Sequence, residues 1–359
     1  MNDAAAALQA ALKSGGPITF ARFMELALYA PGLGYYEQRE HTPGCRGDFF
    51  TSVSVGCLFG ELLAHQFAQW LSAAPQDERL ALVEAGAHDG RLAADVLKTL
   101  QRVYPSLHAR LDFYFLEPSD TRAAWQQETF NELGLKGNRT ARWEDFPRPL
   151  RGVIYSNELL DAMPVHRLGW NAARQEWFEW GVEWRCGGGS WIRLPLSAPE
   201  LPPDLPQALL EVLPDGFTIE VPVAALQWWR QAAACLAPGS RLMTLDYGTL
   251  ADLPLDPRRP RGSLRAYWRH TVQDDLLARP GEQDLTADVP FAAVAQAGQA
   301  EGLVTETLQK QGPFLTRLVL DMGPKLQWSP AQRRQFMTLT HPQHLGERFC
   351  VLVQRRPEG

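Results

Sequence analysis

Two acidic residues, each at the end of an apolar segment, are the first residues of this chain whose positions suggest chemistry. The first apolar segment ends at Glu84 and leads into a turn that contains Gly86 and Gly90, and a helical pattern follows. The second segment, residues 111–116, leads into Glu117. Glycine lets the backbone approach a ligand closely, a helix N-terminus offers unpaired N–H groups, and the later acid can accept both hydroxyls of a ribose. This spacing predicts a nucleoside-sized pocket.

The turn favours one kind of nucleoside ligand. Its pattern, acid-x-Gly-x-x-x-Gly, lacks the complete GxGxxG of dinucleotide-binding turns. S-adenosylmethionine (SAM) has no pyrophosphate and needs no long cradle, so the turn suits SAM better than a dinucleotide. An ordinary strand–turn–helix connection is the alternative interpretation of the glycines, and a solvated strand-end acid is that of Glu117.

Further polar side chains follow two later apolar segments. Asn157 and Glu158 come directly after one of them, and Asp161 lies three residues beyond Glu158. Asp246 and Tyr247 end the other. The carboxyl ends of parallel strands face the ligand crevice, so we expect these side chains to line it. Asp161 has a second interpretation, as an acid that stabilises a helix N-terminus.

The elements that must position these residues alternate along the chain. Helices are expected between predicted strands near residues 81–85, 111–117, 151–156 and 240–246. This alternation is typical of βαβ units and a parallel sheet, so the predicted fold class is α/β.

One region departs from this alternation. Aromatic and polar residues alternate over residues 176–184, and a glycine turn leads to a return over 191–194, which predicts an antiparallel hairpin. We place this hairpin in an insertion at about residues 166–238. The remaining predicted organisation is a helical N-terminal region over residues 1–75 and a core over residues 76–359.

Composition limits the classes of protein to which the chain can belong. A length of 359 residues with 45% apolar content suits an α/β core plus an appendage, and a net charge of −6 argues against a general nucleic-acid binder. The five cysteines include no CxxC pair, so neither a zinc site nor a disulfide framework is expected. No stretch approaches the ~18 apolar residues of a membrane-spanning helix, and the N-terminal residues have no signal or transit character. We therefore expect a cytoplasmic protein without a metal, membrane insertion or a nucleic-acid partner.

An ordered series of short motifs resembles one family, the MidA-like class I SAM-dependent methyltransferases. Each motif is modest alone, but eight in order make the resemblance specific, and they extend through nearly the whole chain. The motifs are residues 24–31 with 34–36, residues 47–52 with 59–61, the glycine turn, and residues 157–165, 245–248, 262–267, 284–289 and 346–349.

The resemblance implies a fold, a cofactor and a reaction. The fold is a Rossmann-like sheet, mostly parallel with one antiparallel strand near the C-terminus, preceded by an N-terminal helical lid. The cofactor is SAM. A mitochondrial relative in this family acts in respiratory complex I assembly by methylating an arginine of a complex I subunit. The resemblance therefore implies methyl transfer to an arginine of a partner protein, with a complex I subunit as one candidate.

The same resemblance, together with strand-end positions, assigns roles to particular residues. The expected cofactor-binding residues are Thr51, Ser52, Glu84, Gly86, His88, Gly90, Glu117, Pro118, Asp145 and Asn157. The expected catalytic residues are Asn157, Glu158 and Asp161. A carboxylate can pair bidentately with a guanidinium and orient its free nitrogen. The expected substrate-binding residues are Asp246, Tyr247, Arg265 and His270.

Two departures from the family pattern keep other functions open. His88 stands where the family usually carries a middle glycine, and Val53-Ser54 stands where it usually carries Pro-Glu. A side chain at position 88 either crowds the methionine end of SAM or contacts it. One alternative is a SAM-binding assembly factor with little catalysis, and another is a small-molecule methyltransferase. The long insertion favours a large surface cleft over a small buried pocket.

Overall fold

The computed structural model describes residues 9–10, 12–13, 15–39, 51–185, 188–196, 205–252, 255–269, 271–323 and 327–358. A central eight-stranded sheet has the order β15-β16-β10-β5-β2-β3-β4, with β14 beside β10. Its strands are β2 (Leu80–Ala85), β3 (Leu111–Leu116), β4 (Asn138–Thr140), β5 (Gly152–Asn157), β10 (Arg241–Thr249), β14 (Val289–Pro290), β15 (Val304–Lys310) and β16 (Phe349–Arg355). β16 runs antiparallel to β10 and β15, and the pairs from β10 to β4 are parallel. This confirms the predicted sheet.

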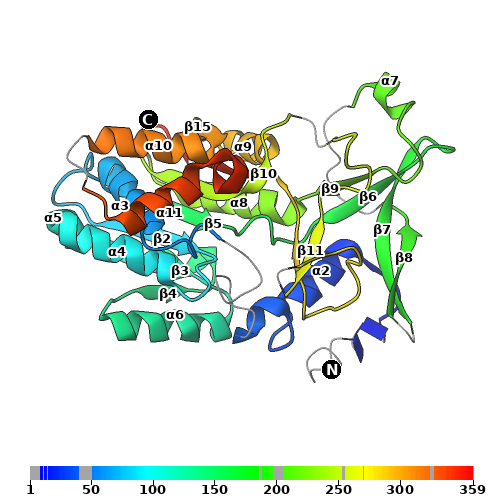
Figure 1. Cartoon of the computed structure of the whole chain (residues 1–359), viewed down its shortest axis with the longest axis horizontal. Helices are drawn as coiled ribbons and strands as arrows, with labels where there is room; N and C mark the ends of the chain where they lie inside the picture. Colours follow the sequence, from blue (N-terminus) through cyan, green and yellow to red (C-terminus); the bar gives the residue numbers. More distant parts are fainter. Residues whose placement is uncertain are drawn as a thin grey trace.

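Helices cover both faces of this sheet (Figure 1). All six residues of β2 and of β5 are buried, as expected for parallel strands covered on both faces. One face packs against α3 (Leu58–Leu71), α4 (Arg91–Val103), α6 (Asp120–Leu133), α10 (Gln311–Met322) and α11 (Pro330–Thr340). The other face packs against α8 (Val223–Cys235) and α9 (Phe291–Ala300).

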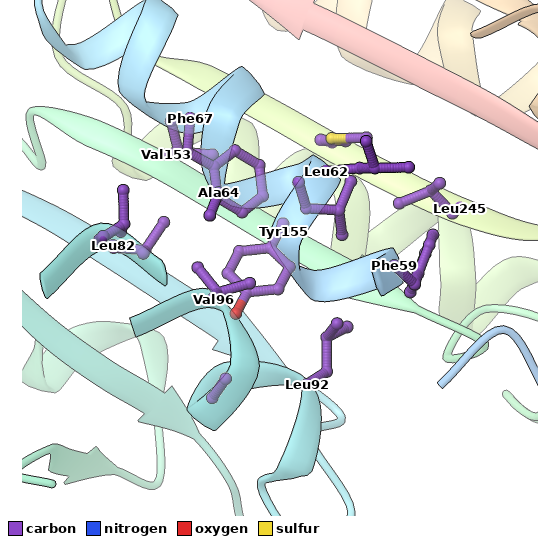
Figure 2. Packing of buried hydrophobic residues seen from close by; sticks show 14 of the residues in the cluster. Phe59, Leu62, Ala64, Phe67, Leu82, Leu92, Val96, Val153, Tyr155 and Leu245 are labelled. Carbon is purple, nitrogen blue, oxygen red and sulfur yellow. The ribbon is translucent and has the colours of Figure 1, made fainter. Parts of the chain in front are cut away.

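The core on the α3 side places a tyrosine beneath the glycine turn. Figure 2 shows the Tyr155 ring of β5 among apolar side chains from α3, α4 and the neighbouring strands. The Tyr155 and Phe67 ring centroids lie 4.8 Å apart. Tyr155 is fully buried, so its hydroxyl needs a partner inside the protein.

A second sheet is antiparallel, with order β1-β7-β6-β9 and β8 paired to β7. Its strands are β1 (Ile18–Thr19), β6 (His166–Asn171), β7 (Glu176–Arg185), β8 (Gly188–Leu194) and β9 (Thr218–Val221). The β7–β8 pair confirms the predicted hairpin. Helix α2 (Phe20–Tyr29) lies against this sheet, on its side toward the central sheet (Figure 1).

A third sheet, which the sequence patterns did not predict, has the order β12-β11-β13. It comprises β11 (Arg265–Trp268), β12 (Thr271–Gln273) and β13 (Asp284–Thr286). These strands are too short to show a clear period. The remaining short elements are η1 (Tyr35–Glu37), α5 (Pro105–His108), η3 (Trp143–Asp145), α7 (Gln207–Leu210) and η4 (Pro342–Gly346).

The boundaries of the predicted N-terminal region and of the predicted insertion stay predictions. Each region contains one helix, α3 or α8, that packs on the central sheet. Within residues 1–75, α2 belongs with the antiparallel sheet, whereas α3 packs in the central core against α4. Within residues 166–238, the antiparallel strands end at Val221, and α8 packs with α9 on the central sheet. None of the helices in the described part of the chain is long and apolar enough to cross a membrane.

Candidate functional site

The carboxyl ends of β2, β3, β5 and β10 open into one cavity of about 2830 Å³. Small-molecule pockets usually measure about 300–1,000 Å³, so this cavity holds more than a nucleoside. Its wall also includes Tyr36 and Glu37 of η1, and Tyr267 and Thr286 of the third sheet. The site is therefore formed between the central sheet, the N-terminal segment and the small sheet.

The glycine turn after β2 requires glycine at Gly86. Gly86 has a φ of +71°, and a Cβ there would lie 2.7 Å from Leu159 Cδ1. Gly90 has a φ of +83° and precedes the first residue of α4. Both glycines therefore adopt a conformation that L side chains rarely take, and the turn brings the backbone to the cavity wall.

His88 occupies the same turn in a left-handed conformation, with a φ of +47°. This conformation gives a physical reason for glycine at the corresponding position of the family. The His88 side chain lines the cavity, and its ring centroid lies 5.6 Å from that of Trp125. Burial lowers the pKa of His88, which favours the neutral imidazole.

Glu84 lies at the end of β2 and is 2% exposed. The Tyr155 hydroxyl donates a hydrogen bond of 2.9 Å to Glu84 Oε2, which provides the partner that the buried tyrosine needs. Burial raises the pKa of Glu84 to about 8. The carboxyl is therefore largely protonated at neutral pH in the ligand-free protein.

Glu117, at the end of β3, accepts four hydrogen bonds. Its Oε1 accepts from the backbone N–H of Ser119 at 2.9 Å and from Arg122 Nε and Nη2 at 3.0 and 2.8 Å. Its Oε2 accepts from Gln126 Nε2 at 3.1 Å. A carboxylate oxygen has two lone pairs, so Oε2 can accept a further bond from a ribose hydroxyl.

Asn157 and Glu158 sit where β5 turns into the next loop. Glu158 has a φ of +52°, and such strain in a non-glycine residue is typical of functional sites. Glu158 Oε1 accepts from Asn157 Nδ2 at 3.0 Å and from the backbone N–H of Ser52 at 3.3 Å. Asn157 Oδ1 is buried and has no hydrogen-bond partner among the residues that the structure describes. A buried acceptor of this kind fits a ligand that donates a hydrogen bond.

Asp246 lies behind the cavity wall and supports the loop after β5. It is fully buried and is absent from the cavity lining. Its Oδ2 accepts the backbone N–H groups of Leu159, Leu160 and Asp161 at 3.1, 2.8 and 3.3 Å. The structure thus corrects the expected substrate contact, because these bonds turn the Asp246 carboxylate away from the cavity.

Four acids converge at this end of the cavity: Asp161, Asp246 and Asp284 are buried, and Glu158 is partly buried. Burial and the charge of Asp246 raise the pKa of Glu158 to about 8 and that of Asp161 well above its usual range. Asp284 of β13 accepts a hydrogen bond of 2.8 Å from the Tyr36 hydroxyl. Glu158, Asp161 and Asp284 line the cavity. We call Glu158, Asp161, Asp246 and Asp284 the acidic cluster.

The other predicted residues have different positions. Thr51 and Pro118 line the cavity, whereas Ser52 is buried behind it and its hydroxyl donates to Gln311 Oε1 at 3.3 Å. Asp145 is exposed and absent from the cavity lining, so its position does not support the predicted adenine contact. A neighbouring residue of η3, Trp143, lines the cavity instead.

The remaining substrate-side predictions lie on the third sheet and on β10. Tyr247 lines the cavity, with its ring centroid 4.0 Å from that of Phe349. Arg265 also lines it, and its Nη2 lies 2.7 Å from Asp288 Oδ1. His270 and residues 47–50 of the predicted lid motif lie outside the described residues.

Ser54 stands where the family usually has an acid, and it closes a tight turn with Thr51. The Ser54 backbone N–H donates to Thr51 Oγ1 at 3.0 Å, and the Ser54 hydroxyl donates to the Thr51 carbonyl at 2.8 Å. Ser54 therefore stabilises this turn through its two hydrogen bonds with Thr51. Arg122, Gln126, Tyr36 and Asp284 complete the site, although sequence reasoning gave them no role.

These groups fit SAM as a ligand. Glu117 Oε2 suits a ribose hydroxyl, the Gly86 turn leaves room for close approach, and Asn157 Oδ1 lacks a donor. Among the described residues, no group of three or more His, Cys, Asp or Glu side chains could hold a metal ion.

Comparison with known families decides between the SAM interpretation and an ordinary α/β turn. Residues 62–309 match the model of a family described as "Putative S-adenosyl-L-methionine-dependent methyltransferase". The chain belongs to this family. This methyltransferase therefore uses SAM as its cofactor, in agreement with the resemblance found in its motifs.

Curated relatives and solved structures support the assignment over almost the full chain. The mitochondrial protein arginine methyltransferase NDUFAF7 of Mus musculus is 27% identical over 97% of this chain and 84% of its own. The Drosophila melanogaster homologue is 29% identical over 96% and 83%. A protein from Burkholderia thailandensis that is described as a "likely methyl transferase" and was crystallised with S-adenosylhomocysteine (SAH) superposes with a TM-score of 0.82 at 29% identity, and the match covers 100% of this chain and 95% of that chain.

The relatives also correct one expectation. The sequence was expected to be that of a cytoplasmic protein, but these curated relatives are named as mitochondrial proteins.

Proposed function

We propose that this methyltransferase transfers the methyl group of SAM to an arginine side chain of a protein substrate. The observation that carries the proposal is the acidic cluster, because its members Glu158, Asp161 and Asp284 line the same cavity as the groups that fit SAM. A guanidinium is planar and cationic, and carboxylates pair with it through two parallel hydrogen bonds. The names of the curated relatives, as protein arginine methyltransferases, support the same substrate class.

Aromatic rings beside the acidic cluster also favour a cationic substrate. The Tyr29 and Tyr36 rings stack with centroids 5.6 Å apart, and both residues line the cavity with Tyr247. The face of an aromatic ring attracts a cation, and Arg guanidinium groups stack well on such faces. Rings and carboxylates together provide both planar packing and charge for one arginine side chain.

The volume of the cavity supports a protein as substrate over a small molecule. About 2830 Å³ is several times the usual volume of a small-molecule pocket. A nucleoside cofactor and an arginine side chain would fill part of it, and a segment of polypeptide fits the remainder. A respiratory complex I subunit, implied by the family resemblance, is one candidate protein.

The chain's own residues provide position and a proton acceptor. SAM, when bound, supplies the activated methyl group. Methylation of a guanidinium nitrogen releases one proton, and Glu158 is well placed to take it. Its raised pKa of about 8 makes its carboxylate a better base than an ordinary glutamate. Asn157 and the Ser52 backbone hold Glu158 Oε1, so the carboxyl has a fixed orientation. Positioning of this kind can supply ~7–11 kcal/mol of barrier lowering.

The test is transfer of labelled methyl groups from SAM to proteins of a cell lysate, followed by analysis of hydrolysed product for methylarginines. Wild-type protein should label arginine, and Glu158→Gln should reduce labelling by at least about 100-fold, because general acid–base catalysis contributes 10²–10⁴-fold. Glu132→Gln is the matched control, since Glu132 is an exposed acid of α6 on the same cavity wall.

Each outcome has a definite meaning. Labelled methyl groups on another residue type, or on small molecules in the absence of protein, would contradict the proposal. SAH binding without any methyl transfer would favour a SAM-binding assembly factor with little catalysis.

A further inference from the structure

Arg122 of α6 joins the expected ribose acceptor to the N-terminal segment. Its Nε and Nη2 bind Glu117, and its Nη1 lies 3.1 Å from Glu37 Oε1 of η1. The side chains of Arg122 and Glu37 are only 12% and 7% exposed. A buried ion pair loses several kcal/mol when one partner is removed. The bridge is therefore a substantial part of what holds η1 against α6.

The same short helix also contacts the other end of the cavity. The residue before Glu37, Tyr36, donates from its hydroxyl to Asp284 Oδ1 of the acidic cluster at 2.8 Å. The ring of Tyr36 stacks on Tyr29, whose hydroxyl donates to the Ala162 carbonyl at 2.8 Å. Ala162 is the neighbour of Asp161 in the chain.

One segment of three residues thus connects two ligand sites. Glu37 faces the cofactor end through Arg122, and Tyr36 faces the substrate end through Asp284. Gln38, the next residue, donates from Nε2 to the Gly281 carbonyl at 2.9 Å and fixes η1 to the loop before β13. A ligand at either end that holds its acid in place also holds this segment.

We propose that Arg122, Glu37 and Tyr36 are positioning residues that couple cofactor binding to the formation of the substrate site. When ribose hydroxyls fix Glu117, Arg122 and Glu37 hold η1 more firmly, and Tyr36 then keeps Asp284 in place in the acidic cluster. A ligand at one end orders the segment that contains η1, so a ligand at the other end loses less conformational entropy when it binds. The two sites therefore bind cooperatively. The inference rests on Glu117 as the ribose acceptor and on the proposed substrate site.

Hydrogen exchange of residues 30–39 with SAH as the ligand tests this coupling. In wild-type protein, SAH should slow exchange in this segment several-fold. Glu37→Gln should remove most of that protection, because a neutral amide binds Arg122 weakly. Glu25→Gln is the matched control and should keep the protection, since Glu25 forms an exposed pair with Arg22 on α2. Equal protection in wild type and Glu37→Gln would overturn the inference.

Tyr36→Phe provides a second, independent test by calorimetric titration of SAH. Tyr36 bonds to Asp284 and not to Glu117, yet coupling should weaken SAH binding about fivefold, at the lower end of typical allosteric coupling. Unchanged SAH affinity in Tyr36→Phe would contradict the link to the acidic cluster. Because the test uses SAH alone, coupling can be confirmed even if the substrate is not arginine. Wild-type SAH affinity in Glu117→Gln would instead refute the ribose assignment on which the coupling depends.

Discussion

Substitution of Glu117 by glutamine should weaken SAH binding, and Arg122 keeps Glu37 as its charged partner in this variant. Glu117 Oε1 is occupied by Ser119 and Arg122, so the amide oxygen must remain there in the variant. The amide NH₂ then takes the place of Oε2 and faces Gln126 Nε2, another donor. Gln126 can rotate its side-chain amide, because its own Oε1 has no partner, but it then loses its bond to the His88 carbonyl.

The expected loss follows from the acceptor that the ribose would lose. A hydrogen bond to a charged group contributes about 1.5–3 kcal/mol. Since 1.4 kcal/mol is a factor of ten in Kd, Glu117→Gln should weaken SAH binding about 10- to 150-fold. The residue is 1% exposed, so water does not screen this contact. Calorimetric titration of SAH measures the change, and Glu132→Gln should bind SAH like the wild type.

Two results would refute this reasoning. A Kd within about twofold of the wild-type value, in a variant with an unchanged unfolding transition, would show that Glu117 does not accept the ribose. Complete loss of folding would show that Glu117 acts mainly as the partner of Arg122.

Three further predictions concern the turn, the loop support and pH. Gly86→Ala should lower the free energy of unfolding by about 1–3 kcal/mol and weaken SAH binding, because its Cβ would meet Leu159. Gly134→Ala is the control, since Gly134 has a φ of +65° and open space around it, and this variant should show the effect of backbone strain alone. Asp246→Asn should lower the free energy of unfolding by about 1–3 kcal/mol, because an amide cannot accept all four backbone N–H groups that Asp246 binds. An unchanged midpoint of denaturant unfolding would contradict this prediction. The kcat/KM for methyl transfer should rise as pH increases from 6 to 9, because Glu158 of the free enzyme ionises near a pKa of about 8, and Glu158→Gln should abolish that rise. Between about pH 4.5 and 8, Glu158 keeps its proton in the folded protein and loses it in the unfolded chain, because its pKa is raised by folding. The contribution of Glu158 to stability should therefore fall as pH rises through this range. Denaturant unfolding of wild type and Glu158→Gln at several pH values measures this fall.

The fold could be predicted largely from sequence because the central strands are continuous apolar runs. β2 and β5 are buried on both faces, and this requirement appears directly in residues 80–85 and 152–157. β11–β13 could not be found this way, since three or four residues show no period. The place of α8 against the central sheet depends on long-range packing, which a local pattern does not record.

The candidate site could be predicted where residues follow strand ends, and less well elsewhere. Glu84, Glu117, Asn157 and Glu158 reach one cavity because parallel strands end at one edge of the sheet. Asp246 also follows this rule, but its side chain bonds to the neighbouring loop, and only coordinates show the direction. Sequence reasoning missed Arg122 and Tyr36. Their contacts with Glu37 and Asp284 join segments that are far apart in the sequence, and a local pattern does not show such contacts.

The protonation of the acidic cluster explains how four acids can lie together in an otherwise neutral interior. Burial raises the pKa of Asp246 to about 7 against the opposing effect of four backbone N–H groups, and burial together with the neighbouring Asp246 raises the pKa of Asp161 well above its usual range, so Asp161 keeps its proton. Glu158, with a pKa of about 8, is also largely neutral at pH 7. The ligand-free cluster thus avoids much of its own repulsion. An arriving guanidinium would reverse this balance, because an opposite charge lowers the pKa of a carboxylate. The substrate itself would then convert Glu158 to the ionised form that the reaction needs as a base, so a non-cationic side chain in the same position would leave the acid protonated and the site inactive.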